Sequence, residues 1–465
     1  MTFFGRTREL RTLSKFFHSN DNLAVVYGRR RIGKSELIKR ALQESKIPSL
    51  YHECKGTSVE RNMEDLLRMA NVELGLSGYD MKTLESVLRW LFEQAADRDM
   101  VLVLDEYPYL RDLLKGCDSV LQAMLDHYRD SSRLKIILCG SYIDVMKGLI
   151  DYKSPLYGRT SVMLHLKPMD YLDAANFYPG FSNADKVRLY SVFGGVPFYI
   201  KNIDPSLSVE ENILELIVDE DARLRTEIEI RQPSEISKIN NAIRVFEAMT
   251  LGAAKFSDIL AESHVSSSPT LADTLNKLIE MGLITKQTPI NEEGNKRRTF
   301  YSIADNLTNF YYRFVFRNLS MTRIIMSNIF YDRFIREEFE TQYVPHIFES
   351  ICCEFLIRRN LLGLNKQPFF KIGKYYYDLP KERRNGEFDV VTFDDLGYIS
   401  YEAKFKIHPM SKAQIEQEIA QVQASPLLAN RFGFISRSGF EGVTPRENLM
   451  LFTLDDLYRD ELRFR

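Results

Sequence analysis

The sequence predicts an α/β protein that opens with a parallel sheet, and three short apolar runs carry this prediction. Residues 23–27, 101–104 and 135–139 are almost entirely apolar, which is typical of strands covered on both faces of a parallel sheet. After the first run, a loop bounded by glycines leads into residues 34–42, where apolar side chains recur at helical spacing. The chain has 465 residues; this is too long for one core, so about three domains are expected.

The loop after the first run has the pattern Gly-x-x-x-x-Gly-Lys-Ser. Glycines let backbone N–H groups turn inward around phosphates, and the N-terminus of the following helix adds a favourable dipole. Lys34 is expected to reach the β- and γ-phosphates, and the Ser35 hydroxyl to hold Mg²⁺. A chance glycine turn is the alternative, which the flanking strand and helix disfavour. The expected nucleotide-binding residues of this loop are Gly28, Arg29, Arg30, Arg31, Ile32, Gly33, Lys34, Ser35 and Glu36.

The second apolar run ends in two acids, Asp105 and Glu106. They follow the carboxyl end of a predicted strand, where ligands bind in parallel sheets. Asp105 is expected to hold the water shell of the Mg²⁺ ion, and Glu106 to polarise the water that attacks the γ-phosphate. The alternative is an acidic strand end that faces solvent.

Two further residues are candidates for contact with the phosphates. Ser141 follows the third apolar run and reaches the same sheet edge, where it either senses the γ-phosphate or caps the next helix. Arg159 lies in the segment SPLYGRT. It either neutralises charge across a subunit or domain boundary or is an ordinary surface arginine.

These motifs together resemble a known ATPase family. FFGRTREL, YGRRRIGKSELIKR, LDEYPYL, CGS, SPLYGR and GGVPFYI are similar to segments of the prokaryotic, AAA-like and STAND-related P-loop ATPases. The resemblance covers residues 1 to about 230 and implies ATP and Mg²⁺ as ligands, an ATPase core over 1–168 and a helical lid over 169–232 that includes the GGVP segment. It also implies that Gly5, Arg6 and Glu9 frame the base side of the nucleotide. Ser35 stands where many relatives have Thr, which keeps the hydroxyl.

The middle of the chain predicts a winged helix over residues 233–305. Gly282 ends a helical pattern, and LITKQTPI and TFYSI read as paired strands with a turn near Gly294. The next segment, 306–335, is dense in aromatic residues and is expected to be a linker helix that packs between domains. The apolar stripe of the helix before Gly282 consists of Leu271, Leu275, Leu278 and Ile279.

A packing and relay role is favoured for this segment over DNA reading. Its expected recognition helix exposes Asp273, Lys277 and Glu280, which match a phosphate backbone poorly. The hairpin is more basic and carries Lys296, Arg297 and Arg298.

Residues 386–406, GEFDVVTFDDLGYISYEAKFK, predict a second hairpin. Apolar and polar residues alternate in the second half, which is typical of a strand with one buried face. Asp394 to Gly397 supply the turn. If residues 395–396 form a two-residue loop, the loop length fixes which residue of the first strand lies opposite each residue of the second.

That register would place Asp389 opposite Glu402, with Cβ atoms about 5 Å apart. Two facing carboxylates repel each other unless a cation lies between them or one is protonated. A divalent metal resolves the repulsion. The alternative is a solvated hairpin in which Glu387 pairs with Lys404 across the strands.

The hairpin resembles the core of the PD-(D/E)xK nuclease superfamily. GEFDVV and ISYEAKFK are also similar to the C-terminal domain of unknown function 234 that accompanies this ATPase family. The resemblance implies an α/β restriction-endonuclease-like domain over residues 336–465, with Mg²⁺ held by Asp389 and Glu402 and the attacking water positioned by Lys404. Glu349, in the preceding helix HIFESICCEFLIRRN, is expected to add a further acid to the metal site.

The expected function is ATP binding and hydrolysis that gates a Mg²⁺-dependent DNA nuclease. The alternative is a regulatory or signalling ATPase whose C-terminal domain only binds a partner or DNA. The formal charge of −2 gives no bulk attraction to nucleic acid, so DNA would be held by local basic patches. Five cysteines without CxxC spacing suit the cytoplasm, and no apolar run approaches the length of a membrane span. ATP, DNA and further copies of the chain are the candidate partners.

Overall fold

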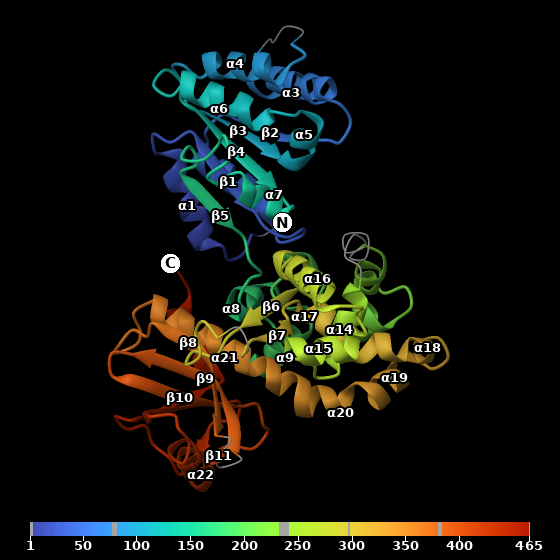
Figure 1. Cartoon of the computed structure of the whole chain (residues 1–465), viewed down its shortest axis with the longest axis vertical. Helices are drawn as coiled ribbons and strands as arrows, with labels where there is room; N and C mark the ends of the chain where they lie inside the picture. Colours follow the sequence, from blue (N-terminus) through green and yellow to red (C-terminus); the bar gives the residue numbers. More distant parts are fainter. Residues whose placement is uncertain (1–2, 77–80, 232–240, 296–297, 380–383, 465) are drawn as a thin grey trace. The chain divides into compact units, whose positions relative to one another are not determined.

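The structure is a computed structural model, and the chain forms two compact units, Met1–Pro168 and Met169–Arg465 (Figure 1). Each unit has its own five-stranded sheet. The described residues are 3–76, 81–231, 241–295, 298–379 and 384–464.

The sheet of the first unit has five parallel strands in the order β2-β3-β4-β1-β5. β1, β3 and β4 are buried along their whole length, so the predicted parallel sheet is confirmed. Lys135, the one charged residue within the three apolar runs, donates from Nζ to the carbonyl oxygens of Ser19 and Asp21 at 2.7 and 2.9 Å. The strands are β1 Leu23–Tyr27, β2 Ser49–Glu53, β3 Met100–Asp105, β4 Leu134–Gly140 and β5 Val162–His165.

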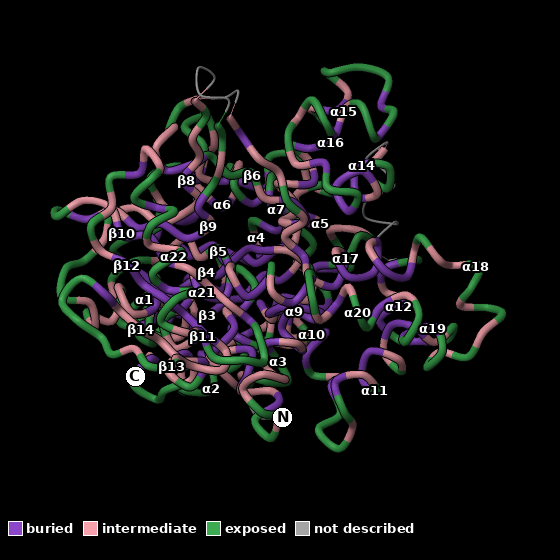
Figure 2. Tube along the Cα trace, turned by 90° about the horizontal axis from the view of Figure 1, so that it is seen from below, coloured by how far each residue is buried: buried purple, intermediate pink, exposed green. Residues whose placement is uncertain are grey.

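Helices cover both faces of this sheet (Figure 1). On one face, α3, α4 and α6 share a core with alternate residues of the central strands, among them Leu102, Leu104 and Ile136. On the other, α1 packs against α2 and the edge strand β5. Figure 2 marks the residues of this core as buried. The helices are α1 Thr7–Phe17, α2 Lys34–Ser45, α3 Val59–Leu74, α4 Leu84–Gln94, α5 Tyr107–Leu113, α6 Cys117–His127 and α7 Ile143–Gly148.

The second unit begins with short helices that bring the GGVP segment against its first residues. The Met169 N–H donates to the Gly195 carbonyl at 2.8 Å. A Cβ on Gly195 would lie 1.7 Å from the Met169 carbonyl oxygen, so only glycine fits at this position. The helical segments are α8 Tyr171–Ala174, η1 Ala175–Phe177, α9 Asn183–Phe193, α10 Pro197–Ile200, α11 Val209–Ile213, η2 Leu214–Val218, α12 Arg223–Thr226 and η3 Glu227–Arg231.

Three helices and an antiparallel strand pair follow. Leu271, Leu275 and Leu278 are buried as one stripe of α16, and Gly282, with φ 69°, follows the helix in the left-handed region. β6 pairs with β7 from Ile284 opposite Ile303 to Gln287 opposite Phe300. The elements are α14 Ala242–Thr250, α15 Phe256–Ser263, α16 Ser268–Glu280, β6 Ile284–Gln287 and β7 Phe300–Ile303.

The segment between β6 and β7, residues 288–295, is here called the connection arm, and it packs on the edge of the C-terminal sheet. The Ile290 N–H donates to the Lys374 carbonyl at 2.9 Å. The Asn291 side chain donates to the Tyr376 carbonyl at 2.8 Å and accepts from its N–H at 3.2 Å. Of the predicted basic residues, Arg298 lies over the Tyr376 ring at 5.2 Å. The other two, Lys296 and Arg297, lie outside the described residues.

Residues 306–335, expected as one linker helix, form several short helical segments. The chain is extended at Met326, with ψ 145°, which interrupts helical hydrogen bonding. The aromatic side chains pack on one another and on the following segment: between ring centroids, Phe314 lies 5.0 Å from Phe310 and 5.3 Å from Tyr343. The segments are α17 Asn306–Phe310, η4 Tyr311–Val315, η5 Phe316–Asn318, α18 Leu319–Thr322 and α19 Ser327–Phe334, and α20 Arg336–Glu338 and η6 Phe339–Tyr343 follow them.

The C-terminal sheet has the order β14-β12-β10-β9-β8 and is mixed. β8, β9 and β10 are antiparallel, whereas β12 and β14 run parallel to β10. α21 contacts β8, β9 and β10, and α22 contacts β12. No helix of the described residues is long and apolar enough to cross a membrane. The main elements are α21 Val344–Leu361, β8 Lys371–Leu379, β9 Arg384–Asp394, β10 Gly397–Lys404, α22 Lys412–Gln423, β12 Ala429–Ser436 and β14 Leu449–Thr453.

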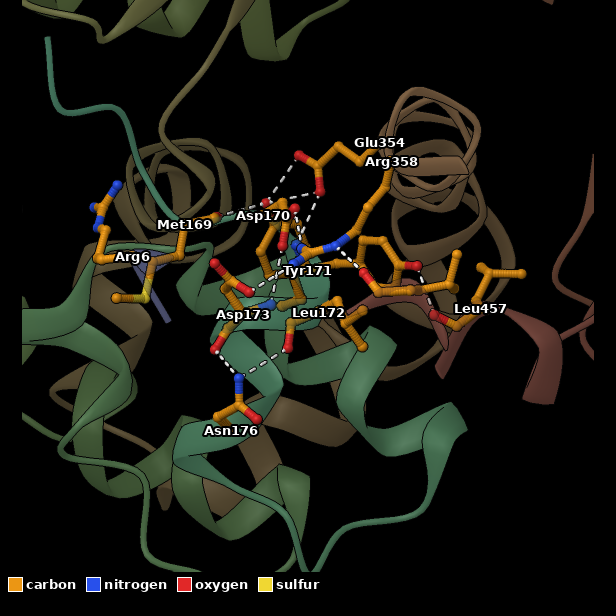
Figure 3. Close-up of polar contacts among 12 residues, drawn as sticks. Arg6, Met169, Asp170, Tyr171, Leu172, Asp173, Asn176, Glu354, Arg358 and Leu457 are labelled. Atoms are coloured by element: carbon orange, nitrogen blue, oxygen red, sulfur yellow. Dashed lines mark hydrogen bonds and ion pairs between the residues drawn. The ribbon is translucent and has the colours of Figure 1, made fainter. Parts of the chain in front are cut away.

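A polar cluster joins the first residues of the second unit to α21 (Figure 3). Arg358 donates to Asp173 at 2.9 Å and also contacts Asp170. One helical turn earlier, Glu354 accepts from the Tyr171 N–H at 2.9 Å and from the Tyr190 hydroxyl at 3.0 Å. Burial, and the charge of Asp170 after it, raise the pKa of Glu354 to about 8. The cluster therefore ties α8 and α9 to the C-terminal domain through buried charges.

Candidate functional sites

The loop between β1 and α2 needs glycine at both ends. A Cβ on Gly28 would lie 2.4 Å from the carbonyl oxygen of Leu166, and Gly33 has φ 90° in the left-handed region. Lys34 begins α2, and its Nζ donates to the carbonyl oxygens of Gly28 and Arg29 at 2.9 and 3.1 Å. Burial lowers the pKa of Lys34. Its ammonium therefore lies across the loop that the sequence predicts as a phosphate cradle.

Ser35, in the first turn of α2, and Asp105, at the end of β3, are the predicted magnesium ligands, and they are in direct contact. The Ser35 hydroxyl donates to Asp105 Oδ2 at 2.7 Å. Tyr51, on the neighbouring strand β2, donates its hydroxyl to the same oxygen. Burial alone would raise the pKa of Asp105, but hydrogen bonds from Tyr51, Cys139 and Ser35 lower it. The carboxylate is thus held ionised beside the hydroxyl, as a cation site requires.

Glu106 and Ser141 also meet at this edge of the sheet. Glu106 has φ 50° just before α5, a left-handed backbone that is unusual outside glycine and recurs at functional positions. The Ser141 hydroxyl lies 3.1 and 3.0 Å from the two oxygens of the Glu106 carboxylate. Since Tyr142 precedes α7 and no side chain caps that helix, Ser141 contacts the acid and not the helix end.

Arg159 is paired within its own unit. Its Nε and Nη2 donate to the two carboxylate oxygens of Asp126 at 2.8 and 2.7 Å. This contact is what the surface-arginine alternative predicts. Arg6, by contrast, is buried and donates to the carbonyl oxygens of Ile32 at 3.2 Å and Lys167 at 2.7 Å. Arg6 therefore fastens the N-terminal segment to the predicted phosphate loop.

In the C-terminal hairpin, the register matches the prediction. β9 ends at Asp394 and β10 begins at Gly397, which leaves a two-residue loop. The ladder runs from Gly397 opposite Asp394 to Tyr401 opposite Val390. Asp389 and Glu402 are the next residues of the two strands.

Asp389, Glu402 and Lys404 line one pocket of about 280 Å³. Lys404 Nζ lies 2.5 Å from Glu402 and 3.2 Å from Glu418, an acid of α22 that lines the same pocket. Burial raises the pKa of Glu402, and Glu418 and Asp389 raise it further against the lowering effect of Lys404. Asp389 and Glu402 therefore share one pocket in which burial is the main effect on the pKa of Glu402.

The Asp389 side of the pocket has its own cation. Lys374 of β8 contacts Asp389 and lies 3.3 Å from Glu387. The cross-strand pair expected in the solvated-hairpin alternative, Glu387 with Lys404, is replaced among the described residues by these contacts. Glu349 of α21 lies 3.2 Å from His346, and its charge is among those that raise the pKa of Lys374.

The donor set fits a hydrated divalent cation. Within the described ranges, no three His, Cys, Asp or Glu side chains are grouped so that they alone could hold a metal ion. Mg²⁺, however, keeps several waters and binds through one or two carboxylates plus substrate phosphates. Asp389 and Glu402 supply two carboxylates to one pocket, which suits this mode.

Three contacting residues were not predicted from the sequence: Tyr51, Lys374 and Glu418. Glu418 could have been found, since it lies three residues after Ile415, a buried residue of α22, and so close to the buried face of the helix. Tyr51 and Lys374 act from neighbouring strands, and no local pattern marks them.

Two domain families match the chain. Residues 3–203 match an ATPase domain found predominantly in Archaea. Residues 311–417 match a family described as archaeal and bacterial proteins of unknown function. An uncharacterised protein of Methanocaldococcus jannaschii, MJECL04, is 30% identical over 403 residues, which are 84% of this chain and 84% of that protein. An uncharacterised ATP-binding protein of the same organism, MJ0423, is 46% identical over 46 residues, 10% of this chain and 78% of that protein.

Among solved structures, the Walker-type ATPase PABY2304 of Pyrococcus abyssi is similar, with a TM-score of 0.51 and 22% identity. The match covers 67% of this chain and 96% of that one, and it shows a shared fold. The match to MJECL04 of M. jannaschii covers 84% of both chains at 30% identity, which is enough to show that the two proteins belong to one family. The chain therefore belongs to the archaeal-type ATPases, with an ATPase domain followed by a C-terminal domain of unknown function.

Proposed function

We propose that the chain is a Mg²⁺-dependent ATPase that controls a Mg²⁺-dependent DNA nuclease in its C-terminal domain. The ATPase family supports the first part, together with the contact between Ser35 and Asp105 at 2.7 Å. One observation carries the second part: Asp389, Glu402 and Lys404 line the same polar pocket.

In the proposed ATPase site, Mg²⁺ supplies positive charge that offsets the phosphates. Lys34 exchanges its carbonyl partners for the β- and γ-phosphate oxygens. Ser35 and Asp105 would hold the cation, and Glu106 orients the attacking water and accepts its proton as the bond to the γ-phosphorus forms. Ser141 keeps the Glu106 carboxylate in position through the contacts at 3.0 and 3.1 Å.

In the proposed nuclease site, Asp389 and Glu402 would hold the cation that offsets charge at the scissile phosphate. Burial lowers the pKa of Lys404, but Glu402 and Glu418 more than reverse this, so the net pKa is raised. Lys404 therefore stays protonated, and it acts by holding the attacking water or hydroxide and not as a base. DNA is the proposed substrate, and the strand-borne carboxylates would face its backbone.

The test is to incubate the purified full chain with supercoiled, linear and single-stranded DNA, with and without Mg²⁺ and ATP. We expect cleavage of at least one form that needs Mg²⁺ and responds to ATP. Lys404→Met should remove cleavage without removing ATP hydrolysis, whereas Lys34→Ala should remove hydrolysis and the ATP response. If no DNA form is cleaved under any condition, the nuclease part of the proposal fails.

A regulatory switch is the second candidate function. It is favoured by the internal neutralisation of the acids, since Lys374 and Lys404 each contact two carboxylates, as in a structural ion-pair network. In that case the C-terminal domain would bind a partner or DNA without cutting. Binding of DNA that persists in Asp389→Asn and needs no Mg²⁺ would support this candidate.

We also propose that α14–α16 with β6 and β7 form a winged helix that acts as a packing module. The hydrogen bonds of Ile290 and Asn291 to β8 support this role. We place the protein in the cytoplasm, where ATP is available and its five free cysteines stay reduced. We also propose that the chain assembles into oligomers, in which Arg159 leaves Asp126 and acts on a neighbouring copy. Sedimentation of the ATP-bound protein tests this.

A further inference from the structure

Lys374 lies opposite a β-bulge of β9 that includes the candidate metal ligand Asp389. In the β8–β9 ladder, the register shifts between Gly373 and Tyr375. Lys374 is the one β8 residue between them, and two β9 residues, Asp389 and Val390, lie opposite it. The extra residue is therefore on β9, and a bulge of this kind bends that strand and re-aims its side chains at that point.

The Lys374 ammonium binds the acidic side of the pocket. Lys374 Nζ contacts Asp389 and lies 3.3 Å from Glu387. An ammonium that donates to a carboxylate oxygen uses an acceptor site that a metal ion needs, and it repels a second cation at short range. Lys404 lies on the other side of the pocket, where it contacts Glu402 and Glu418, so Lys374 is the ammonium on the Asp389 side.

The connection arm (residues 288–295) holds the strand that carries Lys374. The Ile290 N–H donates to the Lys374 carbonyl at 2.9 Å, and Asn291 hydrogen-bonds both backbone groups of Tyr376. Gly373 allows the close approach, since a Cβ there would lie 3.1 Å from Ile290 Cγ2. The arm therefore holds the β8 backbone at Lys374 and at Tyr376.

We propose that Lys374 is a built-in counter-ion that competes with the divalent cation for Asp389, and that the connection arm keeps it in that position. The proposal rests on the metal binding by Asp389 and Glu402 put forward above. Removal of the ammonium then strengthens cation binding, and loosening of the arm does so to a smaller extent. The connection arm thereby regulates a metal site on the neighbouring sheet.

Calorimetric titration of Mn²⁺ into the nucleotide-free full chain tests this. Lys374→Met keeps the apolar stem and should bind Mn²⁺ about tenfold more tightly than the wild type, which corresponds to about 1.4 kcal/mol. Asn291→Ala should tighten binding about threefold, since it removes two neutral hydrogen bonds. Lys412→Met removes a lysine that is 70% exposed in the same domain and should match the wild type. The double variant Asp389→Asn/Glu402→Gln measures binding at any other site.

Each outcome separates the two proposals. Equal Kd values for the wild type and Lys374→Met, both tighter than the double variant, would overturn the counter-ion while metal binding stands. Heats that never exceed those of the double variant would overturn the metal site itself. If Lys374→Met binds Mn²⁺ more tightly than the wild type and Asn291→Ala binds it with wild-type affinity, the role of the arm is overturned. Circular dichroism checks folding, and Lys374→Gln replaces Lys374→Met if the latter is unfolded.

Discussion

Glu106 combines an unusual backbone with a restrained side chain. Its φ is 50°, and both carboxylate oxygens lie within hydrogen-bonding distance of Ser141. A group that orients water must be held in one geometry, because a loosely held base loses the advantage of position. The backbone turn aims the acid and the serine restrains it.

Replacement of this acid should separate binding from turnover. Glu106→Gln is expected to bind ATP with nearly unchanged affinity but to hydrolyse it about 10²–10⁴-fold more slowly, since it removes the proposed general base and leaves the proposed phosphate cradle intact. Steady-state hydrolysis and equilibrium binding of a fluorescent ATP analogue measure the two quantities. Lys34→Ala is the contrasting control, which should weaken binding itself. Normal turnover of Glu106→Gln would place the base elsewhere.

Tyr51 offers a test of a residue that the sequence did not reveal. Tyr51→Phe removes the donor to Asp105 and should cost about 1 kcal/mol of stability, the worth of a typical hydrogen bond. Asp105 keeps the Ser35 hydroxyl and the Glu106 N–H as donors. We therefore expect the Mg²⁺ concentration for half-maximal ATPase rate to change several-fold while the maximal rate is retained. Titration of the rate with Mg²⁺ checks this.

The residues that sequence reasoning found are those in local motifs. Lys34 and Ser35 stand in one loop, and Asp105 directly follows an apolar run, so spacing along the chain predicts them. Tyr51 and Lys374 reach their partners across strands that are 54 and 15 residues away in sequence. Such contacts depend on strand order and on a bulge, and neither leaves a periodic signal.

Among the elements, the C-terminal hairpin was the most predictable, because a two-residue loop and alternation fix the register together. The bulge in β9 was not predictable, since an extra residue on one strand needs no special residue type. The connection arm was expected only as a wing. Its pairing with β8 is a tertiary contact, which local patterns cannot specify.

The cluster that ties α21 to α8 should make stability depend on pH. Burial and Asp170 raise the pKa of Glu354 from 4.5 to about 8, so between these values the unfolded chain loses a proton that the folded chain keeps. The stability contributed by this group is thus full below about pH 4.5 and falls as the pH rises towards 8, by up to about 1.4 kcal/mol for each unit of pH.

Glu354→Gln cannot ionise and keeps an oxygen that accepts from the Tyr171 N–H, so it should lack this decline. The melting temperature of the variant relative to the wild type should therefore rise from pH 5 to pH 8, as measured by scanning fluorimetry. Glu416→Gln, at a position that is 63% exposed, is the matched control and should show no such trend. A constant difference between Glu354→Gln and the wild type across this range would contradict the expectation.

For the whole molecule, the sequence predicted about three domains, and the chain forms two compact units. The two candidate sites lie in different units: Lys34 and Glu106 in the first, Asp389 and Glu402 in the second. Each ligand should therefore act first on its own unit. Any further effect of one ligand on the other unit is a coupling free energy, and it must be reciprocal.

Calorimetric melting of the full chain should reveal this arrangement. A non-hydrolysable ATP analogue with Mg²⁺ is expected to raise the transition of the first unit, and Mn²⁺ alone that of the second. A ligand at one hundred times its Kd adds about 2.7 kcal/mol to the unit that binds it. Lys34→Ala should lose only the nucleotide shift and Asp389→Asn only the Mn²⁺ shift.

If control by ATP is built into the fold, the analogue must also move the second transition in the wild type but not in Lys34→Ala. Two transitions that respond independently would leave an ATPase and a metal-binding domain that share a chain without controlling each other.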